Sequence, residues 1–337
     1  MTVRNDPVGC AVTLDSLSKQ SRVADEIVVV DGGSTDDTVA VIKRLAQTNP
    51  RIRCVETGRG NIAQGRNLAA RMATGDILAC IDGGCRAEPD WLERLTRPFE
   101  LDAETEFVAG FYRIEPRSLL ETVVGLATMR GQLEPIKPES FNPSARSLAC
   151  TKSLWQRVGG WPEWLRFSED TLFDHKVRAL GVKWHLAEDA VVHWRPRTSL
   201  RAVGRQFYNY GTGRGHTQIG AKSFAYNLRN VALCAMTAGL CGVTAWAALV
   251  LAAMLMYFYV WTFHRKAVRV ARWVGKRTLS GGARPTSVGR WRAYPLCLIV
   301  MWVVLFSNLV GYLVGSWQRW RDRDRFRGRM EAYLAGV

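Results

Sequence analysis

Acidic residues are scarce in the last third of this 337-residue chain. Residues 231–337 hold 3 Asp+Glu against 15 Lys+Arg, whereas residues 1–230 hold 27 against 31, so most of the formal net charge of +16 lies near the C-terminus. These basic residues flank two uncharged apolar runs and do not form the aromatic-interleaved basic surface that is typical of nucleic-acid binding. We therefore expect no nucleic-acid partner and predict contact with anionic lipid headgroups.

Several other features are missing. None of the eight cysteines forms a CxxC pair, so a zinc site is not expected, and unpaired cysteines are typical of a reducing, cytosolic compartment. The polar N-terminus does not have the pattern of a signal peptide. With 47% hydrophobic residues the chain is not disordered, and its length allows one large domain or two modest ones.

Apolar strand-like runs alternate with helical patterns over the first two thirds of the chain. Glu26–Asp31 is a β-branched run of the kind found in a strand buried on both faces. Further strands are predicted at 52–56, 76–82, 107–114, 183–186 and 190–193, and helices at 8–20, 38–47, 63–74, 89–99, 150–160, 169–180 and 200–210. This alternation predicts an α/β domain with a doubly wound, mostly parallel sheet.

Two aspartates end predicted strands and are each followed by two glycines. Asp31 and Asp82 would both lie at the carboxyl edge of the sheet, where ligands bind in such folds. Each could instead only cap the turn that follows it. Glu169 and Asp170 open a predicted helix, where acidic residues are also favoured by the helix dipole alone.

Two uncharged apolar runs indicate a membrane region. Residues 231–263 and 293–317 contain no Asp, Glu, Lys or Arg, and about 20 apolar residues suffice to cross a bilayer. Between them, the segment 264–292 carries nine Lys+Arg and no acid, and the tail 318–337 carries six arginines.

The topology of this region has more than one solution. Basic segments stay on the cytoplasmic side of a membrane, so two single crossings would place residues 264–292 on the outer side, against this rule. A helix of 33 residues would be ~50 Å long, against a hydrocarbon core of ~30 Å. The first run could be a hairpin broken near Gly239–Gly242, or a steeply tilted helix with an interfacial part. The basic segment could lie in the headgroup layer.

Short motifs follow one another in a characteristic order. They are Thr2–Asp6, Asp31–Asp36, Gly65–Asn67, Ala73–Asp76, Ile81–Cys85, Gly159–Glu163, Ser168–Leu172 and Arg205–Gly211. In this order and spacing they resemble family 2 glycosyltransferases of the GT-A fold over about residues 2–216.

The resemblance implies a Rossmann-like, mostly parallel nucleotide-diphospho-sugar transferase domain at 1–225, followed by C-terminal transmembrane helices in a membrane region at 226–337. The sequence resembles the membrane-anchored bacterial type of this family, so we expect it in the inner (cytoplasmic) membrane with the catalytic domain facing the cytosol.

The resemblance also implies a donor site. Thr2, Asn5 and Asp31 would surround the base and ribose of a nucleotide sugar, for which a UDP-sugar is favoured. Asp82 would lie at the ribose and diphosphate beside Mg²⁺ or Mn²⁺, which uses carboxylate and phosphate oxygens. Arg66, through its motif, is also expected to bind the donor.

Two further arginines, Arg205 and Arg214, are candidates for contact with the diphosphate, although each could simply solvate a helix face. Trp161 or Trp164 could form an apolar floor under the acceptor, or be plain packing.

For catalysis, the resemblance assigns Asp170 as the general base of an inverting transfer, on the face opposite the leaving group. Glu169 would orient Asp170 or raise its pKa by like-charge repulsion.

Two departures from the family pattern stand out. The usual second carboxylate of the metal motif is replaced by Gly84. His193 could then complete the metal site with Asp82, or be an ordinary hydrogen-bonded strand-end histidine. Only Met1 precedes Thr2 where the family has an apolar strand, so we expect a truncated start. Without that strand, Thr2 and Asn5 would not be held in position as ligands of the donor.

We therefore predict an inverting glycosyltransferase acting on a lipid-linked or membrane-proximal glycan. The alternative is a non-catalytic subunit that binds nucleotide sugar or lipid in a glycan synthesis or export complex, which the two departures would favour. A nucleotidyltransferase is disfavoured because its Gly-rich loop is missing. The apolar run Leu119–Met129 could rest on the membrane interface or pack in the core.

Overall fold

The computed structural model describes residues 1–129, 131–136, 138, 141–240, 245–276 and 287–335. The chain divides into two compact units. Unit 1 comprises residues 1–115, 136–195 and 327–337, and unit 2 comprises 116–135 and 196–326. The boundary predicted after residue 225 separates a catalytic from a membrane region, and it stays a prediction.

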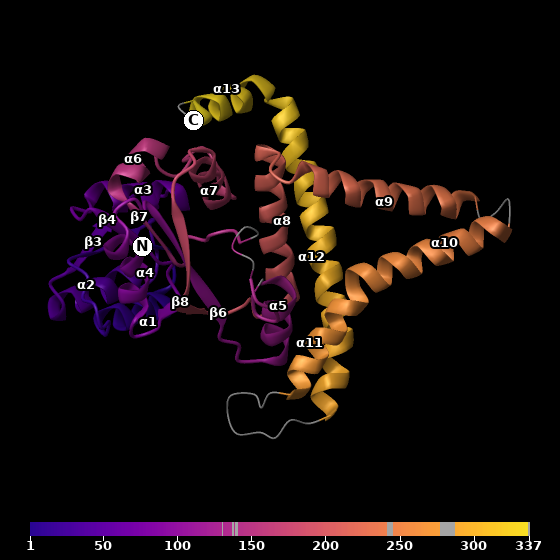
Figure 1. Cartoon of the computed structure of the whole chain (residues 1–337), viewed down its shortest axis with the longest axis horizontal. Coiled ribbons are helices and arrows are strands. Elements are labelled where there is room, and N and C mark those ends of the chain that lie inside the picture. The colour runs from indigo at the N-terminus through magenta and orange to yellow at the C-terminus, as the bar shows by residue number, and fades with distance from the viewer. Residues whose placement is uncertain (130, 137, 139–140, 241–244, 277–286, 336–337) are drawn as a thin grey trace. The chain divides into compact units, whose positions relative to one another are not determined.

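Unit 1 is an α/β unit in which helices flank short strands (Figure 1). Its strands are β1 (Thr2–Val3), β2 (Ile27–Asp31), β3 (Ile52–Glu56), β4 (Ile77–Cys80), β5 (Arg86–Ala87), β6 (Phe107–Ile114), β7 (Leu148–Thr151) and β8 (Trp184–Trp194). Its helices are α1 (Pro7–Ser18), α2 (Thr38–Thr48), α3 (Ile62–Met72), α4 (Trp91–Leu101), α6 (Lys152–Val158), α7 (Glu169–Ala179) and the part of α13 (Arg323–Leu334) from Arg327 onward.

The first sheet is parallel, in the order β1-β2-β3. Along β2, Ile27 and Val29 pack in one apolar cluster with side chains of α1 and α2, whereas Val28 and Val30 pack with Ala69 of α3. The predicted strand buried on both faces is therefore present. Its carboxyl end places Asp31 at the edge of the sheet.

The start of the chain forms an edge strand on β2. Thr2 pairs with Val30, the Met1 carbonyl accepts from the Val30 N–H at 3.0 Å, and the Met1 amino group donates to the Val28 carbonyl at 2.8 Å. Met1–Val3 thus occupies the backbone positions beside β2 at the carboxyl edge.

The second sheet is mixed, in the order β4-β7-β6-β8-β5. Only β6 and β8 are parallel, so the expectation of a mostly parallel sheet holds for the first sheet and not for the second. The difference comes from β5, which runs antiparallel to β8, and from β7, which runs antiparallel to both of its neighbours. Strand β7 also covers residues 150–151, which we expected to begin a helix. A four-residue apolar run is too short for its periodicity to distinguish strand from helix.

The two short strands predicted at 183–186 and 190–193 form one strand, β8. An irregularity opposite Gly110 and Phe111 of β6 interrupts its register, and this irregularity accounts for the break in the hydrophobic pattern.

Unit 2 is helical. It contains α5 (Leu119–Thr128), α8 (Leu200–Thr217), α9 (Ala221–Leu240), α10 (Ala245–Phe258), a π-helical segment at Tyr259–His264, α11 (Arg265–Lys276) and α12 (Ser287–Arg321). Helix α5 is buried from Glu121 to Ala127, so the apolar run at 119–129 packs in the core of this unit.

Among the described residues, one helix is long and apolar enough to cross a membrane by length and composition. It covers Gly289–Arg321 within α12 and includes the predicted run 293–317. The run 231–263 falls on α9, α10 and the π-helical segment. Residues 241–242 of the predicted break and 277–286 of the basic segment lie outside the described residues.

Candidate active site

An arginine joins two acidic residues that are distant in sequence. Arg66 lies on α3, whose N-terminus is fixed by a capping box between Asn61 and Gln64. Its Nη1 donates to Glu169 Oε1 at 2.7 Å and its Nη2 donates to Asp82 Oδ1 at 2.8 Å. Arg66 and Glu169 are buried, whereas Asp82 is partly exposed. These two contacts, which we call the Arg66 fork, connect the loop after β4 with the first turn of α7.

The two carboxylates differ in their proton affinity. Burial, followed by the negative charge of Asp170, raises the pKa of Glu169 to about 7, against the opposing effect of Arg66. Burial also acts to raise the pKa of Asp82, but the positive charges of Arg66 and Arg146 outweigh it and hold that pKa below its usual range. At neutral pH Asp82 is therefore an anion, while Glu169 gains and loses its proton.

Asp170 follows a strained residue at the start of α7. Ser168, the N-cap, adopts a left-handed conformation with φ 64° and ψ 23°. Such backbone costs free energy, and residues that adopt it cluster at functional sites. Asp170 is partly exposed, its Oδ1 accepts from the Thr171 N–H at 2.8 Å, and its charge acts on both Glu169 and Arg66. An accessible carboxylate beside a fixed cation can accept a proton from a hydroxyl.

Asp31 and Asn5 organise one loop. Both Asp31 oxygens accept hydrogen bonds, from the Gly33 and Ser34 N–H groups at 3.0 and 2.9 Å and from the Ser34 hydroxyl at 2.5 Å. Asn5, with φ 50°, accepts from the Thr35 N–H at 2.9 Å. The capping role that the sequence left open for Asp31 is therefore present. Contact of either residue with a donor stays a prediction.

Thr2 packs against α3. A Cβ added to Gly65 would lie 2.6 Å from Thr2 Cγ2, so the helix comes this close only because residue 65 is glycine. Thr2 is thereby held against the residue that directly precedes Arg66 on α3. Its role toward the donor stays a prediction.

A metal site is not complete in the protein alone. Within the described ranges, no group of three His, Cys, Asp or Glu residues could hold a metal ion. Gly84, where the family pattern has a second aspartate, has φ +82°, and a Cβ there would lie 3.3 Å from Asp6 Oδ2. His193 Nε2 lies 3.0 Å from Glu88 Oε1. Asp82 fits a divalent cation only if the phosphates of a ligand supply further oxygens.

Sequence reasoning missed a second cation in the site. The Arg146 guanidinium lies over the rings of Tyr112 and Trp194, 5.5 and 4.9 Å from their centroids, and its charge lowers the pKa of Asp82. Arg146 precedes β7 in a loop and belongs to no motif, so only the fold shows that it lies near Asp82.

Asn67, the neighbour of Arg66, holds the loop Gly159–Trp164. Its Nδ2 donates to the Trp161 carbonyl at 2.8 Å and to Glu163 Oε1 at 2.9 Å, and its Oδ1 accepts from the Trp161 N–H at 2.8 Å. Trp161 is buried against Phe173, whereas Trp164 is partly exposed and lines an open hollow of about 580 Å³. Of the two tryptophans, Trp164 is the one available to a ligand.

Arg205 and Arg214 lie on α8 of unit 2. Their contact with a donor diphosphate stays a prediction.

Comparison with known proteins gives a consistent family. Residues 1–145 match the family model described as glycosyl transferase family 2. The chain is 24% identical over 195 residues to the succinoglycan biosynthesis protein ExoA of Rhizobium meliloti, covering 56% of this chain and 59% of that protein. It is 33% identical over 179 residues to validoxylamine A glucosyltransferase of Streptomyces hygroscopicus subsp. jinggangensis, covering 51% and 38% of the two chains. The chain thus spans less than two thirds of the length of these relatives.

Among solved structures, the mannosyltransferase PcManGT from Pyrobaculum calidifontis, in complex with GDP-Man and Mn²⁺, is similar with a TM-score of 0.55 and 20% identity. The similarity covers 94% of this chain and 85% of that one, and it confirms the predicted GT-A fold.

Proposed function

We propose that this chain, a family 2 glycosyltransferase sequence over its first 145 residues, moves a sugar from a nucleoside diphosphate sugar to an acceptor hydroxyl with inversion at the anomeric carbon. The proposal is supported by the family match and by the similar mannosyltransferase, which was solved with a nucleotide sugar. The observation that carries it is the fork from Arg66 to Asp82 and Glu169, beside the partly exposed Asp170.

In the proposed reaction, Asp170 takes the proton of the acceptor hydroxyl as the hydroxyl oxygen bonds to the anomeric carbon. The bond from that carbon to the diphosphate oxygen breaks, and the nucleoside diphosphate leaves with the electron pair. Glu169 and Arg66 hold the first turn of α7, and with it Asp170, against the Asp82 loop. Positioned charges of this kind are more effective in a dry site than in water.

The residues that would hold the donor are Thr2, Asn5, Asp31, Arg66, Asp82 and Arg205. Arg146 joins this set because its charge acts on Asp82. Asp82 together with the donor phosphates would hold Mg²⁺ or Mn²⁺, which when bound neutralises charge on the leaving diphosphate. The similar mannosyltransferase was solved with Mn²⁺ and GDP-Man. GDP-sugars are therefore candidate donors as well as the UDP-sugars that we favour.

A lipid-linked or membrane-proximal glycan is proposed as the acceptor. The helix at Gly289–Arg321 is apolar enough to bind a bilayer, and the related succinoglycan protein is named for polysaccharide biosynthesis. A catalytic unit tethered to a bilayer meets lipid-linked substrates at a high effective concentration.

The test is release of nucleoside diphosphate by the full chain in detergent, with a panel of UDP-, GDP- and TDP-sugars, and with membrane lipid extract as acceptor. Extract-dependent release from one donor, lost in Asp170→Asn, is expected. Loss of release with a chelator would indicate that Asp82 still supports a metal. Nucleotide binding without release from any donor would instead favour the non-catalytic binding subunit.

A further inference from the structure

Helix α12 carries a continuous exposed apolar stripe. The residues recur at helical spacing, and they are Ile299, Trp302, Phe306, Val310, Leu313 and Trp317. The opposite face is packed within unit 2, where Ala293, Cys297 and Val300 are buried. A stripe of this length on one side only is typical of a helix that lies between protein and an apolar medium.

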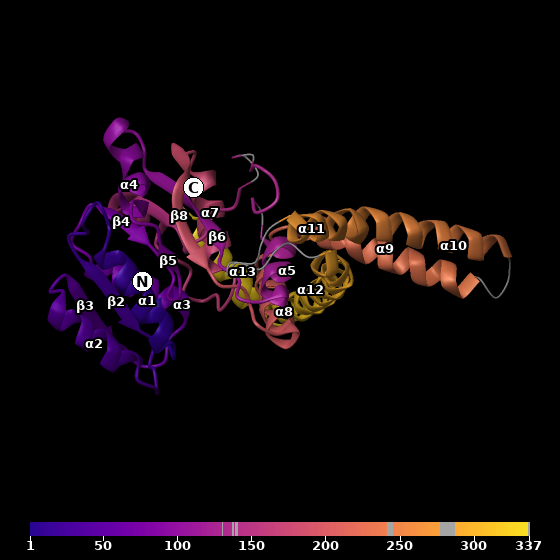
Figure 2. The same ribbon diagram turned by 90° about the horizontal axis from the view of Figure 1, so that it is seen from below.

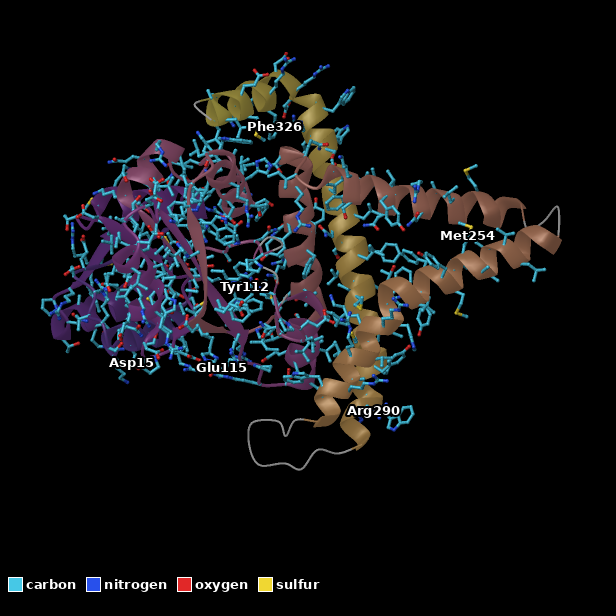
Figure 3. All side chains as sticks on the ribbon, viewed as in Figure 1. Asp15, Tyr112, Glu115, Met254, Arg290 and Phe326 are labelled. Carbon is cyan, nitrogen blue, oxygen red and sulfur yellow. The ribbon has the colours of Figure 1, made fainter. Side chains whose placement is uncertain are left out.

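Helices α9 and α10 form a hairpin that also exposes apolar side chains. The two helices approach each other toward the end of α9 and the start of α10 (Figures 1 and 2), and side chains project from both (Figure 3). Met236, Leu249, Val250 and Met256 are all more than half exposed. A soluble surface rarely leaves so many large apolar side chains together in water.

The described part of each arm of this hairpin is too short to cross a bilayer. The uncharged part of α9, residues 231–240, is ~15 Å long, and α10 is ~21 Å long, against a hydrocarbon core of ~30 Å. Beyond α10 the chain is already packed on α12, because Phe263 is buried and stacks on Trp302 with centroids 4.6 Å apart. The hairpin therefore reaches about the middle of a bilayer and returns.

The path of the chain limits the number of crossings. The chain leaves unit 1 after residue 195 and re-enters it at Arg327. In this last part of unit 1, the Tyr333 hydroxyl donates to the Gly160 carbonyl at 2.7 Å. Unit 1 lies on one side of a membrane, so residues 196–326 must cross it an even number of times. Since a returning hairpin contributes no net crossing, a single passage by α12 is excluded.

The packing of α8 also argues against a passage by α12. Glycines bring the two helices into backbone contact: a Cβ on Gly211 would meet the Asn308 carbonyl at 2.2 Å, and one on Gly315 would meet that of Thr212 at the same distance. Helix α8 carries Arg201, Arg205 and Arg214. If α12 spanned the bilayer, α8 would be drawn into the hydrocarbon with these arginines, which is strongly unfavourable.

Positive charges and tryptophans accompany the apolar surface. On α11 the arginines Arg265, Arg269 and Arg272 form one exposed stripe, and Trp291 and Trp320 are exposed near the two ends of α12. Arginine and tryptophan at such positions match the anionic headgroup layer of a membrane.

We propose that unit 2 is a monotopic anchor for a bilayer with anionic headgroups. The α9–α10 hairpin enters one leaflet, the exposed stripe of α12 lies along the surface of the same leaflet, and no helix crosses. The described parts of the basic segment, 264–276 and 287–292, then stay on the side of the catalytic unit, as the charge rule for membrane proteins requires. This inference does not depend on the proposed reaction.

The test uses the full chain in bacterial membranes, with the eight natural cysteines replaced by alanine and one cysteine introduced at a time. Val8→Cys reports unit 1, Arg272→Cys reports α11 and Arg325→Cys reports α13, all at exposed positions. A membrane-impermeant maleimide should label all three in inverted vesicles and none in spheroplasts. Labelling of Arg272→Cys from the face opposite to Val8→Cys would establish two crossings, and labelling of Arg325→Cys from that face would establish one; either result overturns the proposal.

A second measurement tests the hairpin. The pair Leu249→Asp and Met256→Asp should lower flotation of the purified protein with phosphatidylglycerol vesicles at least ~10-fold, because two charges must leave the hydrocarbon. The matched control pair is Val23→Asp and Leu101→Asp, which are exposed apolar positions of unit 1 and should leave flotation unchanged. Equal flotation of the two paired variants would remove the hairpin from the bilayer and overturn the proposal.

Discussion

Arg66 and Glu169 form a buried ion pair, with Nη1 2.7 Å from Oε1, although 103 residues separate them. Both side chains are less than a tenth exposed, so removal of Arg66 would leave the buried Glu169 without its opposite charge. Because the other arm of the same guanidinium binds Asp82, one arginine fixes the spacing between the proposed donor and base residues.

Replacing Arg66 by lysine should separate charge from geometry. Lysine keeps the positive charge but cannot donate to two carboxylates in a planar fork. We expect the free energy of unfolding to fall by about 1–3 kcal/mol in urea titrations, and donor turnover to fall at least ~10-fold. Arg71→Lys, an exposed position on the same helix, is the control. Equal effects of the two substitutions would contradict the role of the fork.

Replacing Asp170 by asparagine should remove the proposed base without changing the fold. We expect kcat to fall by ~10²–10⁴ while donor affinity and thermal midpoint change little, because the partly exposed side chain makes few structural contacts. Turnover and nucleotide binding should be measured on the same preparation. Asp15→Asn, an exposed residue of α1, is the matched control. A kcat close to that of the unchanged protein would exclude Asp170 as the base.

The sequence predicted the elements that have strong local patterns. Ile27–Val30 is β-branched throughout and lies in a strand buried on both faces, and Glu169–Asp170 open α7 as expected. The antiparallel β7 could not be predicted, because its four residues carry no periodicity and their partners, β4 and β6, are distant in sequence.

The site was predictable where it follows motifs and not where it depends on packing. Asp82, Arg66 and Glu169 were singled out from short motifs, and the structure brings them together. Arg146 reaches the same site through ring contacts with Tyr112 and Trp194, which are 34 and 48 residues away in sequence. No local pattern encodes such a contact.

The activity should depend on pH through Glu169, whose pKa is raised to about 7. Below this pH the carboxyl becomes neutral and loses its charge interaction with Arg66, so the hold on the first turn of α7 weakens. A group with this pKa is ionised to an extent that differs ~10-fold between pH 8 and pH 6, so we expect kcat/KM to fall by about that factor. Glu169→Gln should lack this inflection; an inflection that persists in the variant would assign it to another group.

Asp174 should make stability depend on pH. Both of its oxygens are buried without a hydrogen-bond partner among the described residues, and burial, followed by the charge of Asp170, raises its pKa well above the ordinary value. The folded state therefore binds this proton more tightly than the unfolded state, whose pKa is ~3.9. Its stabilising effect is fully present below that value and is lost as pH rises through the folded pKa.

Asp174→Asn removes this ionisation. The thermal midpoint of the variant, relative to the unchanged protein, should therefore rise steadily from pH 4 to pH 8, with a gain of several degrees for each ~1–2 kcal/mol of relief. The measurement is a series of thermal unfolding curves at fixed ionic strength. A difference in midpoint that is the same at every pH would show that Asp174 is not protonated in the folded state.

Two adjacent glycines give the sharpest test of how the site loop is held. Gly159 and Gly160 both have positive φ, 81° and 71°, but a Cβ on Gly159 meets nothing within 4 Å, whereas one on Gly160 lies 2.5 Å from Asn67 Oδ1. Gly159→Ala should cost only the left-handed conformation, ~1 kcal/mol. Gly160→Ala should cost at least ~2 kcal/mol more in urea titrations, because Asn67 is fixed by Trp161 and cannot withdraw without losing its hydrogen bonds.

If Asn67 is the cause, the cost of Gly160→Ala should shrink in an Asn67→Ala background, a coupling that a double-mutant cycle measures directly. Equal costs for the two glycines, or no coupling to residue 67, would mean that this asparagine does not hold the loop in place.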